Sequence, residues 1–179
     1  MIESRTAFEL LLDIDRRCRM LAAELPSQES RLQTWSGIGF GMGGHWYVAP
    51  MGEVAEVLPE PRTTRLPGAR HWVVGVANLR GRLLPVIDLC GFLGHELSPR
   101  RQHRRVLVVD REDVFVGLLV DEVAGLQHFG LANHQLALPA DVAPSIAPFL
   151  QGHFQREHPW CVFSPVSLVQ APAFLDVAL

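Results

Sequence analysis

The segment that decides the fold reads Val73-Val-Gly-Val-Ala-Asn-Leu-Arg-Gly-Arg-Leu-Leu-Pro-Val-Ile-Asp-Leu89. Two apolar runs, residues 72–79 and 83–89, lie on either side of its polar triplet Arg80-Gly81-Arg82. Two such runs around a glycine-containing turn are typical of adjacent β-strands. Pro85 lacks a backbone N–H, so we expect the second strand to lie at a sheet edge or at a bulge.

Short β segments of the same kind recur through most of the chain. They are expected at residues 38–40, 45–49, 54–58, 105–110, 114–120, 123–129 and 160–163. Brief helical turns are expected near residues 90–93 and after the Ser164-Pro165 pair, and residues 132–154 are expected to be mostly loop. Closely spaced strands with almost no helix between them predict an all-β protein and argue against a βαβ fold.

The N-terminal residues differ from the rest, because they predict an amphipathic helix over residues 6–25. Thr6 and Glu9 have the spacing of a capping box, and Pro26 ends the helix. The apolar residues that share one face of this helix are Leu11, Ile14, Cys18, Leu21 and Leu25. Such a stripe either packs on the helix's own domain or docks on a partner protein, and the sequence leaves both readings open.

The composition excludes several classes of enzyme. The chain has 179 residues, 48% of them apolar, and a formal net charge of −3. All 16 of its cationic residues are arginine, which rules out a Schiff-base lysine and a P-loop lysine. The common catalytic motifs are missing from the sequence, so we expect no catalytic residue and no cofactor.

The cysteines and histidines give no sign of a metal centre. Cys18, Cys90 and Cys161 are widely spaced, which fits free thiols in a reducing compartment better than a disulfide framework. His153, His158 and Cys161 lie close in sequence, but without a second tight pair of ligands we expect no metal site. With no signal peptide or membrane-spanning helix expected, the sequence predicts a soluble, cytoplasmic protein.

Arg80 lies in an apolar stretch of the sequence. Because an unpaired buried charge is very costly, we expect its guanidinium to have an anionic partner. Glu56, on the expected strand over residues 54–58, is the leading candidate.

A second basic feature is the cluster Arg100-Arg-Gln-His-Arg-Arg105. It is typical of a solvated loop, and an acidic protein partner is the next interpretation. Nucleic acid is a distant third, because the chain is acidic overall and the neighbouring residues offer no aromatic platform for bases.

Four ordered blocks of the sequence resemble one protein family. Asn78-Leu-Arg-Gly81 followed by Pro85-Val-Ile-Asp-Leu89 is similar to the signature of CheW-like domains, the coupling adaptors of bacterial chemosensory arrays. Met51-Gly-Glu-Val-Ala-Glu-Val57 is similar to the family's early strand, and Val116-Gly-Leu-Leu-Val-Asp-Glu-Val123 to the strand pair after its middle turn. The resemblance covers most of the chain.

The resemblance implies an all-β fold of two five-stranded SH3-like barrel subdomains, without catalysis. It implies that one barrel face binds the regulatory domain of a CheA-type histidine kinase and that the groove between the barrels takes the cytoplasmic tip of a methyl-accepting chemoreceptor. Arg80 and Glu56 match the family's arginine and its acidic partner, as a partner-binding or structural ion pair. The positions that match the receptor groove are Val54, Gly117 and Val123. The motif itself comprises Asn78, Leu79, Arg80, Gly81, Pro85 and Asp88.

The early part of the chain resembles one branch of the family. The N-terminal helix and the Trp35-Ser-Gly-Ile-Gly-Phe40 segment are similar to the adaptor of the pathway that controls type IV pilus twitching. We therefore expect a helix and connector over residues 1–33, a CheW-like domain over 34–170 and a tail over 171–179. Recruitment to membrane-associated arrays, in rings with other CheW-like domains, is implied as well. The alternatives are a flagellar chemotaxis adaptor and, more distantly, a small-barrel nucleic-acid-binding protein.

Overall fold

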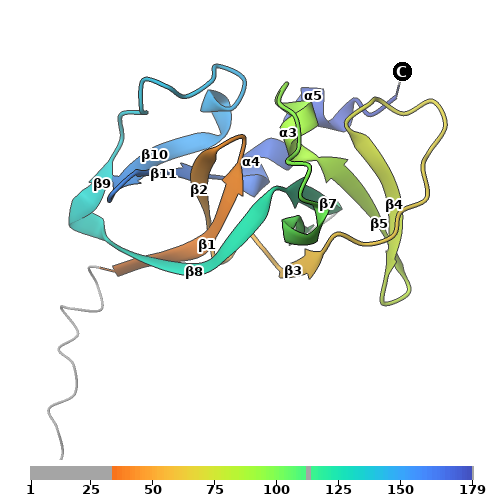
Figure 1. Cartoon of the computed structure of the whole chain (residues 1–179), viewed down its shortest axis with the longest axis horizontal. Helices are drawn as coiled ribbons and strands as arrows, with labels where there is room; N and C mark the ends of the chain where they lie inside the picture. Colours follow the sequence, from red (N-terminus) through yellow and green to blue (C-terminus); the bar gives the residue numbers. More distant parts are fainter. Residues whose placement is uncertain (1–33, 112–113, 179) are drawn as a thin grey trace, which may run out of the picture. The chain divides into compact units, whose positions relative to one another are not determined.

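Two curled β-sheets and three short α-helices form the part of the chain that the computed structural model describes, residues 34–111 and 114–178 (Figure 1). The predicted helix over residues 6–25 lies outside the described residues. The all-β class predicted from the sequence is confirmed.

The first sheet has six strands in the spatial order β8-β1-β2-β11-β10-β9. These strands are β1 (Thr34–Met42), β2 (His45–Pro50), β8 (Glu122–Gly130), β9 (His134–Gln135), β10 (Leu150–Gln155) and β11 (Pro159–Phe163). All neighbours are antiparallel except β2 and β11, which run parallel. Five strands are expected in this subdomain, and β9 is the additional sixth strand. Both β9 and β10 lie in the region that the sequence predicts to be mostly loop.

The second sheet has five strands in the order β3-β6-β7-β5-β4. These strands are β3 (Glu56–Pro59), β4 (Val73–Leu79), β5 (Arg82–Asp88), β6 (Arg105–Arg111) and β7 (Val114–Val120). β5 and β7 run parallel, and the other pairs are antiparallel. The predicted β4–β5 pair is present, and so are the strands predicted over residues 105–110 and 114–120.

One apolar cluster belongs to both sheets. Phe40, Tyr47 and Phe163 come from the first sheet and lie in the same buried cluster as Leu107 and Leu118 from the second. Alternate residues along a strand point to opposite faces of the sheet, so the intervening residues of the second sheet fill a separate cluster of their own. Burial on both faces explains why these strands read as nearly continuous apolar runs.

The first sheet also has an apolar cluster of its own, and it is largely aromatic. Phe129, Phe154 and Trp160 are buried in it together with Val48 and Val162. The rings of Phe129 and Phe154 are stacked with centroids 4.6 Å apart. The two sheets are therefore joined by a shared core, and each sheet closes over a smaller cluster.

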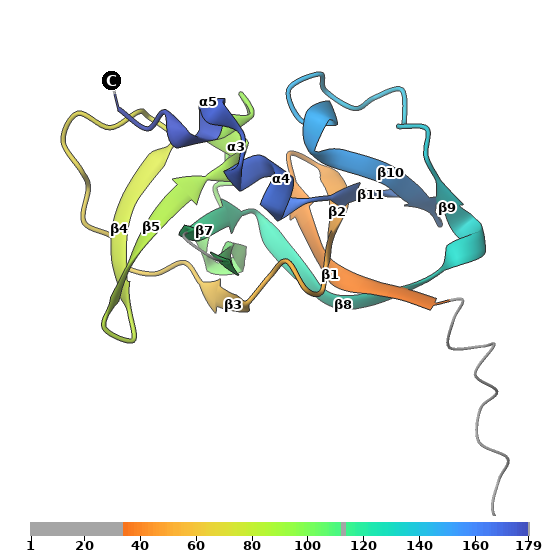
Figure 2. The ribbon, with the colours of Figure 1, turned by 180° about the vertical axis from the view of Figure 1, so that it is seen from behind.

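Three short helices are present in the described part of the chain, one after β5 and two in succession after β11. They are α3 (Leu89–Phe92), α4 (Pro165–Val169) and α5 (Pro172–Leu175). Ser164 caps α4 as predicted, since its side chain accepts a hydrogen bond from the Ser167 backbone N–H. α4 and α5 follow β11 towards the second sheet (Figure 2), where Phe174 stacks on Trp72 with centroids 6.1 Å apart.

The expectation that Pro85 lies in an edge strand is wrong. β5 lies between β7 and β4. Pro85 faces Val76 across the β4–β5 ladder, and the parallel pairing with β7 begins one residue later, at Val86. The lack of a backbone N–H at Pro85 is tolerated because β5 has no paired neighbour on its β7 side before Val86. A bulge does lie nearby, in β4 between Val73 and Gly75.

Gly75 and Gly68 provide a matched test of this packing, because both have a positive φ. A Cβ at Gly75 would lie 2.3 Å from the carbonyl oxygen of Thr64, which already accepts a hydrogen bond from the Val76 N–H, whereas nothing lies within 4 Å of a Cβ at Gly68. We expect Gly75→Ala to lower the free energy of unfolding by about 3 kcal/mol or more, and Gly68→Ala by about 1 kcal/mol through backbone strain alone. Chemical denaturation measures both, and equal losses would contradict the close approach at Gly75.

Candidate functional site

The turn of the β4–β5 hairpin presents Arg80 in a strained backbone conformation. Arg80 has φ +52° and Gly81 has φ +85°, as a two-residue hairpin turn of the favoured type requires. Arg80 is the one non-glycine residue with positive φ among residues 34–111 and 114–178. A left-handed conformation costs a non-glycine residue about 1–2 kcal/mol. A strained, non-glycine turn residue of this kind is a reason to look for function.

Arg80 forms an ion pair with Glu56 at the start of β3. The Nη2 atom of Arg80 lies 2.7 Å from Oε1 of Glu56. The Arg80 side chain is 75% exposed and the Glu56 side chain 28% exposed, so the sequence-based argument that Arg80 is a buried charge is wrong. An exposed pair of this kind contributes less than about 1 kcal/mol. The small contribution of this ion pair to the stability of the fold therefore does not explain why a strained arginine occupies the turn.

A second ion pair lies beside the first. Arg82 Nη1 is 2.6 Å from Asp110 Oδ2, and the Arg82 guanidinium lies 3.7 Å from the centroid of the Phe115 ring. The hydrogen bond to Asp110 raises the pKa of Arg82. The two pairs line one hollow of about 210 Å³, together with Leu79, Ala55, Val108 and Phe115. We call this the hairpin site.

Sequence reasoning missed Arg82, Asp110 and Phe115. Arg82 follows the motif directly, and Asp110 ends an apolar run just before a turn, so each could be identified as a charge at a strand end. The sequence does not show that these three residues lie close together. That follows from the order β6-β7-β5 in the second sheet.

Other residues of the motif build the hairpin and the helix after it. Asn78 Oδ1 accepts a hydrogen bond from the Gly81 N–H at 2.8 Å, across the turn. Asp88 Oδ1 accepts one from the Gly91 N–H at 2.8 Å and caps α3. Burial raises the pKa of Asp88. Leu79 packs against the second sheet's own cluster. Within the motif, Arg80 is thus the charged side chain that reaches solvent from the turn.

The candidate receptor-groove residues lie in less exposed places. Val54 and Val123 are half-buried and pack against the shared core. Gly117 is buried in β7, where a Cβ would lie 2.5 Å from Cγ1 of Val106 and 3.3 Å from Cδ2 of Leu84. Packing alone therefore requires a glycine at position 117.

The histidines and thiols do not gather into a metal centre within the described ranges. His153 is buried and its Nδ1 lies 2.8 Å from the Ala137 carbonyl oxygen, while the His158 ring lies tilted beside Trp46 with centroids 6.0 Å apart. Burial raises the pKa of the Cys90 thiol to about 12 and that of Cys161 to about 11. Both thiols are free and protonated at neutral pH, which makes them poor nucleophiles.

The described residues also contain no helix that is both long and apolar enough to cross a bilayer. The surface of the described residues carries hollows lined by ion pairs, and the hairpin site is one of them.

Comparison with known proteins identifies the family. Residues 36–173 match the family described as "CheW-like domain". The chain belongs to the CheW-like family. It is 60% identical over 179 residues to Protein PilI of Pseudomonas aeruginosa, and the match covers 100% of both chains. It is 40% identical over 70 residues to Chemotaxis protein CheW of Thermotoga maritima, covering 39% of this chain and 46% of that protein.

A solved structure supports the fold. The crystal structure of scaffolding protein TtCheW from Thermoanaerobacter tengcongensis aligns with a TM-score of 0.65 at 20% identity, covering 78% of this chain and 94% of that one. The CheW-like fold predicted from the four sequence blocks is confirmed. This CheW-like chain is thus an adaptor of the chemotaxis type, from a family that is not catalytic.

The buried thiols give a test of the structure near the shared core. In a chain with Cys18→Ser, we expect Cys90 and Cys161 to resist Ellman's reagent near pH 8 in the native state, because both are buried and protonated. Both should react at once in concentrated guanidinium chloride. Reaction of either thiol in the native protein at the rate of a free cysteine would contradict the burial described here.

Proposed function

We propose that this chain couples a methyl-accepting chemoreceptor to a CheA-type histidine kinase in a pathway that controls type IV pili. The pilus assignment is supported by the similarity to Protein PilI, which extends over all 179 residues and so includes the segment before the CheW-like match at residues 36–173. The similarity to Chemotaxis protein CheW of Thermotoga maritima covers 39% of this chain. A pilus adaptor is therefore favoured over a flagellar one.

The hairpin site supports the kinase half of the proposal. Arg80 is strained and exposed, and it faces a partner that contributes little to stability. A charged side chain that the fold does not need is well suited to recognise another protein, since rim charges set specificity and association rate. This single observation carries the proposed contact with the kinase regulatory domain.

Val54, Val123 and the segments around them support the receptor half. Val54 lies between β2 and β3, close to the anchored residue Glu53, whose Oε2 accepts hydrogen bonds from Ser164 Oγ at 2.8 Å and the Val166 N–H at 3.0 Å. That anchor ties the segment to α4. Val54 is half-buried, so its outer part is available to an apolar receptor surface.

A cytoplasmic position at membrane-associated arrays follows from this proposal. Separate faces for kinase and receptor allow head-to-tail contacts with other CheW-like domains, which close into rings when the rotation permits. Within such an array, weak contacts are strengthened by effective concentration.

Charge reversal at Arg80 tests the kinase contact. We expect Arg80→Glu to weaken binding to the regulatory domain of the cognate CheA-type kinase at least about tenfold in isothermal titration calorimetry. The thermal melting midpoint should stay nearly unchanged, since the exposed pair stabilises the fold little.

The double variant Arg80→Glu with Glu56→Arg is the matched control, because it rebuilds the ion pair in reverse. Binding that stays weak shows that Arg80 itself meets the partner. If the double variant binds like the wild type, the pair is an internal strut and the kinase contact lies elsewhere. A wild-type chain that never binds the regulatory domain would overturn the kinase half altogether.

Val54→Arg tests the receptor contact. We expect binding to a receptor cytoplasmic tip to fall at least about tenfold, because a charge replaces an apolar contact, and pull-down with that tip measures it. Val54→Ala is the control, with stability reduced by about 1 kcal/mol. If Val54→Arg loses fold and binding together while Val54→Ala binds normally, Val54 is a core residue and not a receptor contact.

A further inference from the structure

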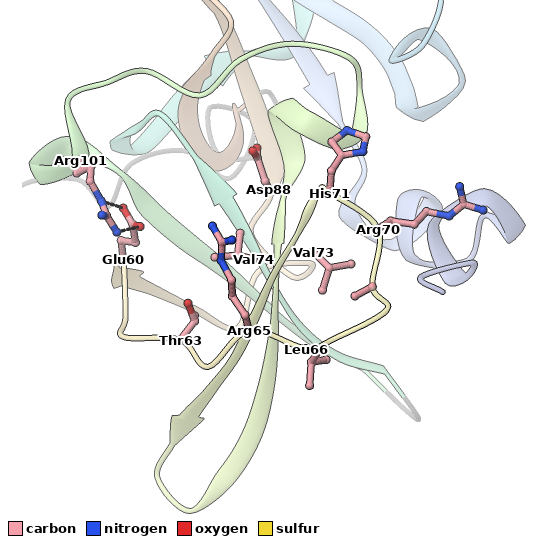
Figure 3. Close-up of a pocket in the computed structure, with 11 residues that line it drawn as sticks. Glu60, Thr63, Arg65, Leu66, Arg70, His71, Val73, Val74, Asp88 and Arg101 are labelled. Atoms are coloured by element: carbon pink, nitrogen blue, oxygen red, sulfur yellow. Dashed lines mark hydrogen bonds and ion pairs between the residues drawn. The ribbon is translucent and has the colours of Figure 1, made fainter. Parts of the chain in front are cut away.

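A basic groove runs along the second sheet, apart from the hairpin site. Two adjoining hollows of about 610 Å³ and 310 Å³ share Glu60 and Arg101 in their linings. We call the two together the basic groove. Figure 3 shows the larger hollow, with Arg101 and Glu60 on one wall and Arg65 pointing from its loop toward Val74.

The groove is built by the pairing of β3 with β6. Pro59 at the end of β3 lies opposite Arg105 at the start of β6. The chain that leaves β3 therefore begins beside the chain that enters β6, so the loop over residues 60–71 meets the arginine cluster over residues 100–105. The sequence cluster is thus one wall of a groove and not an isolated solvated loop.

Arginine side chains outnumber carboxylate side chains in the lining of this groove. Five arginines line it against two carboxylates: Arg65, Arg70, Arg101, Arg104, Arg105, Glu60 and Asp88. Arg70 is already paired with Asp176 outside the lining. An excess of two positive charges remains, although the whole chain has a net charge of −3. The excess is a local property of the groove.

Part of this charge holds the walls together. Glu60 is only 11% exposed and lies between Arg101, at 2.6 Å, and Arg104, at 3.6 Å. Arg104 Nε also donates to the Ser98 carbonyl oxygen at 2.8 Å. This network links the two segments before anything binds, and a preorganised site loses less entropy on binding.

Two arginines of the lining are left for a ligand. Among the described residues, Arg65 and Arg105 have no carboxylate within ion-pair distance. Arg105 Nη1 donates only to the carbonyl oxygens of Gln102 and Arg104. A guanidinium group matches a carboxylate with two parallel hydrogen bonds.

The remaining lining favours a polypeptide over a nucleic acid. No Phe, Tyr or Trp lines either hollow in the described part of the chain, so the stacking platform that single-stranded nucleic acid uses is missing. Aliphatic side chains are present instead. Leu66 is 49% exposed and lies with Val73 and Val74 in the larger hollow, where it can contact an apolar side chain.

We propose that the basic groove binds an acidic segment of a partner protein that carries an aliphatic residue among its carboxylates. No residue of the hairpin site lines either hollow of the basic groove, and Val73 and Val74 of the larger hollow lie at the opposite end of β4 from Arg80. This contact is therefore separate from the proposed kinase and receptor contacts and does not rest on them.

An NMR titration of the full-length ¹⁵N-labelled chain tests the proposal. The probe is a short glutamate-rich peptide with one leucine, and its control has glutamine at every glutamate position. We expect amide shifts to change within residues 60–71 and 100–105 with the acidic peptide and not with the control. Lack of change there, or equal change with the glutamine peptide, overturns the proposal.

Matched variants separate a site from general attraction. We expect Arg65→Glu with Arg105→Glu to weaken peptide binding at least about tenfold, and Arg62→Glu, in the same loop but outside the lining, less than about twofold. The amide spectrum of each variant reports its fold, and the single change Arg65→Gln, expected to weaken binding about threefold, replaces the double variant if that one is unfolded. Equal losses in the lining and control variants overturn the proposal, and so does tighter binding of a thymidine oligonucleotide to the same residues.

Discussion

The shared apolar cluster between the two sheets is the constraint on which the rest of the structure depends. Strands such as β6 and β7 bury alternate residues in this cluster and in the second sheet's own core. A sheet buried on both faces has no broad surface left for recognition. Around β6 and β7, turns, strand ends and connecting loops are therefore the places where contacts with other proteins are expected.

The hairpin site has the exposed charges that the proposed kinase contact needs. Asn78 and Gly81 shape the turn, and the turn places Arg80 in solvent beside Glu56. The neighbouring Arg82–Asp110 pair lies over Phe115. Charges that are paired but exposed can exchange their internal partner for an external one at small cost, because both states are well hydrated. This suits an adaptor, whose work is reversible binding.

The basic groove follows the same principle on a larger scale. The register between β3 and β6 brings two segments together, and Glu60 of the first pairs with Arg101 and Arg104 of the second. Arg65 lines the hollow that also contains aliphatic side chains, and Arg105 lines the adjoining one. The two charged surfaces share no lining residue, so binding of a partner at one is expected to leave the lining of the other free.

The sequence predicted Glu56 as the partner of Arg80, but on an argument about burial that the structure overturns. By itself the sequence determined most strands, the β4–β5 hairpin and the Ser164 cap. These features depend on local patterns of apolar residues, glycine and capping side chains, which act over a few residues. Tertiary structure alone decided that Arg80 is exposed, that Pro85 lies in a central strand and that residues 150–155 form a strand. It also decided which charges meet in the hairpin site and the basic groove. Those outcomes depend on parallel pairing and register between segments distant in sequence, because burial of the shared core selects one arrangement among many with similar local preferences.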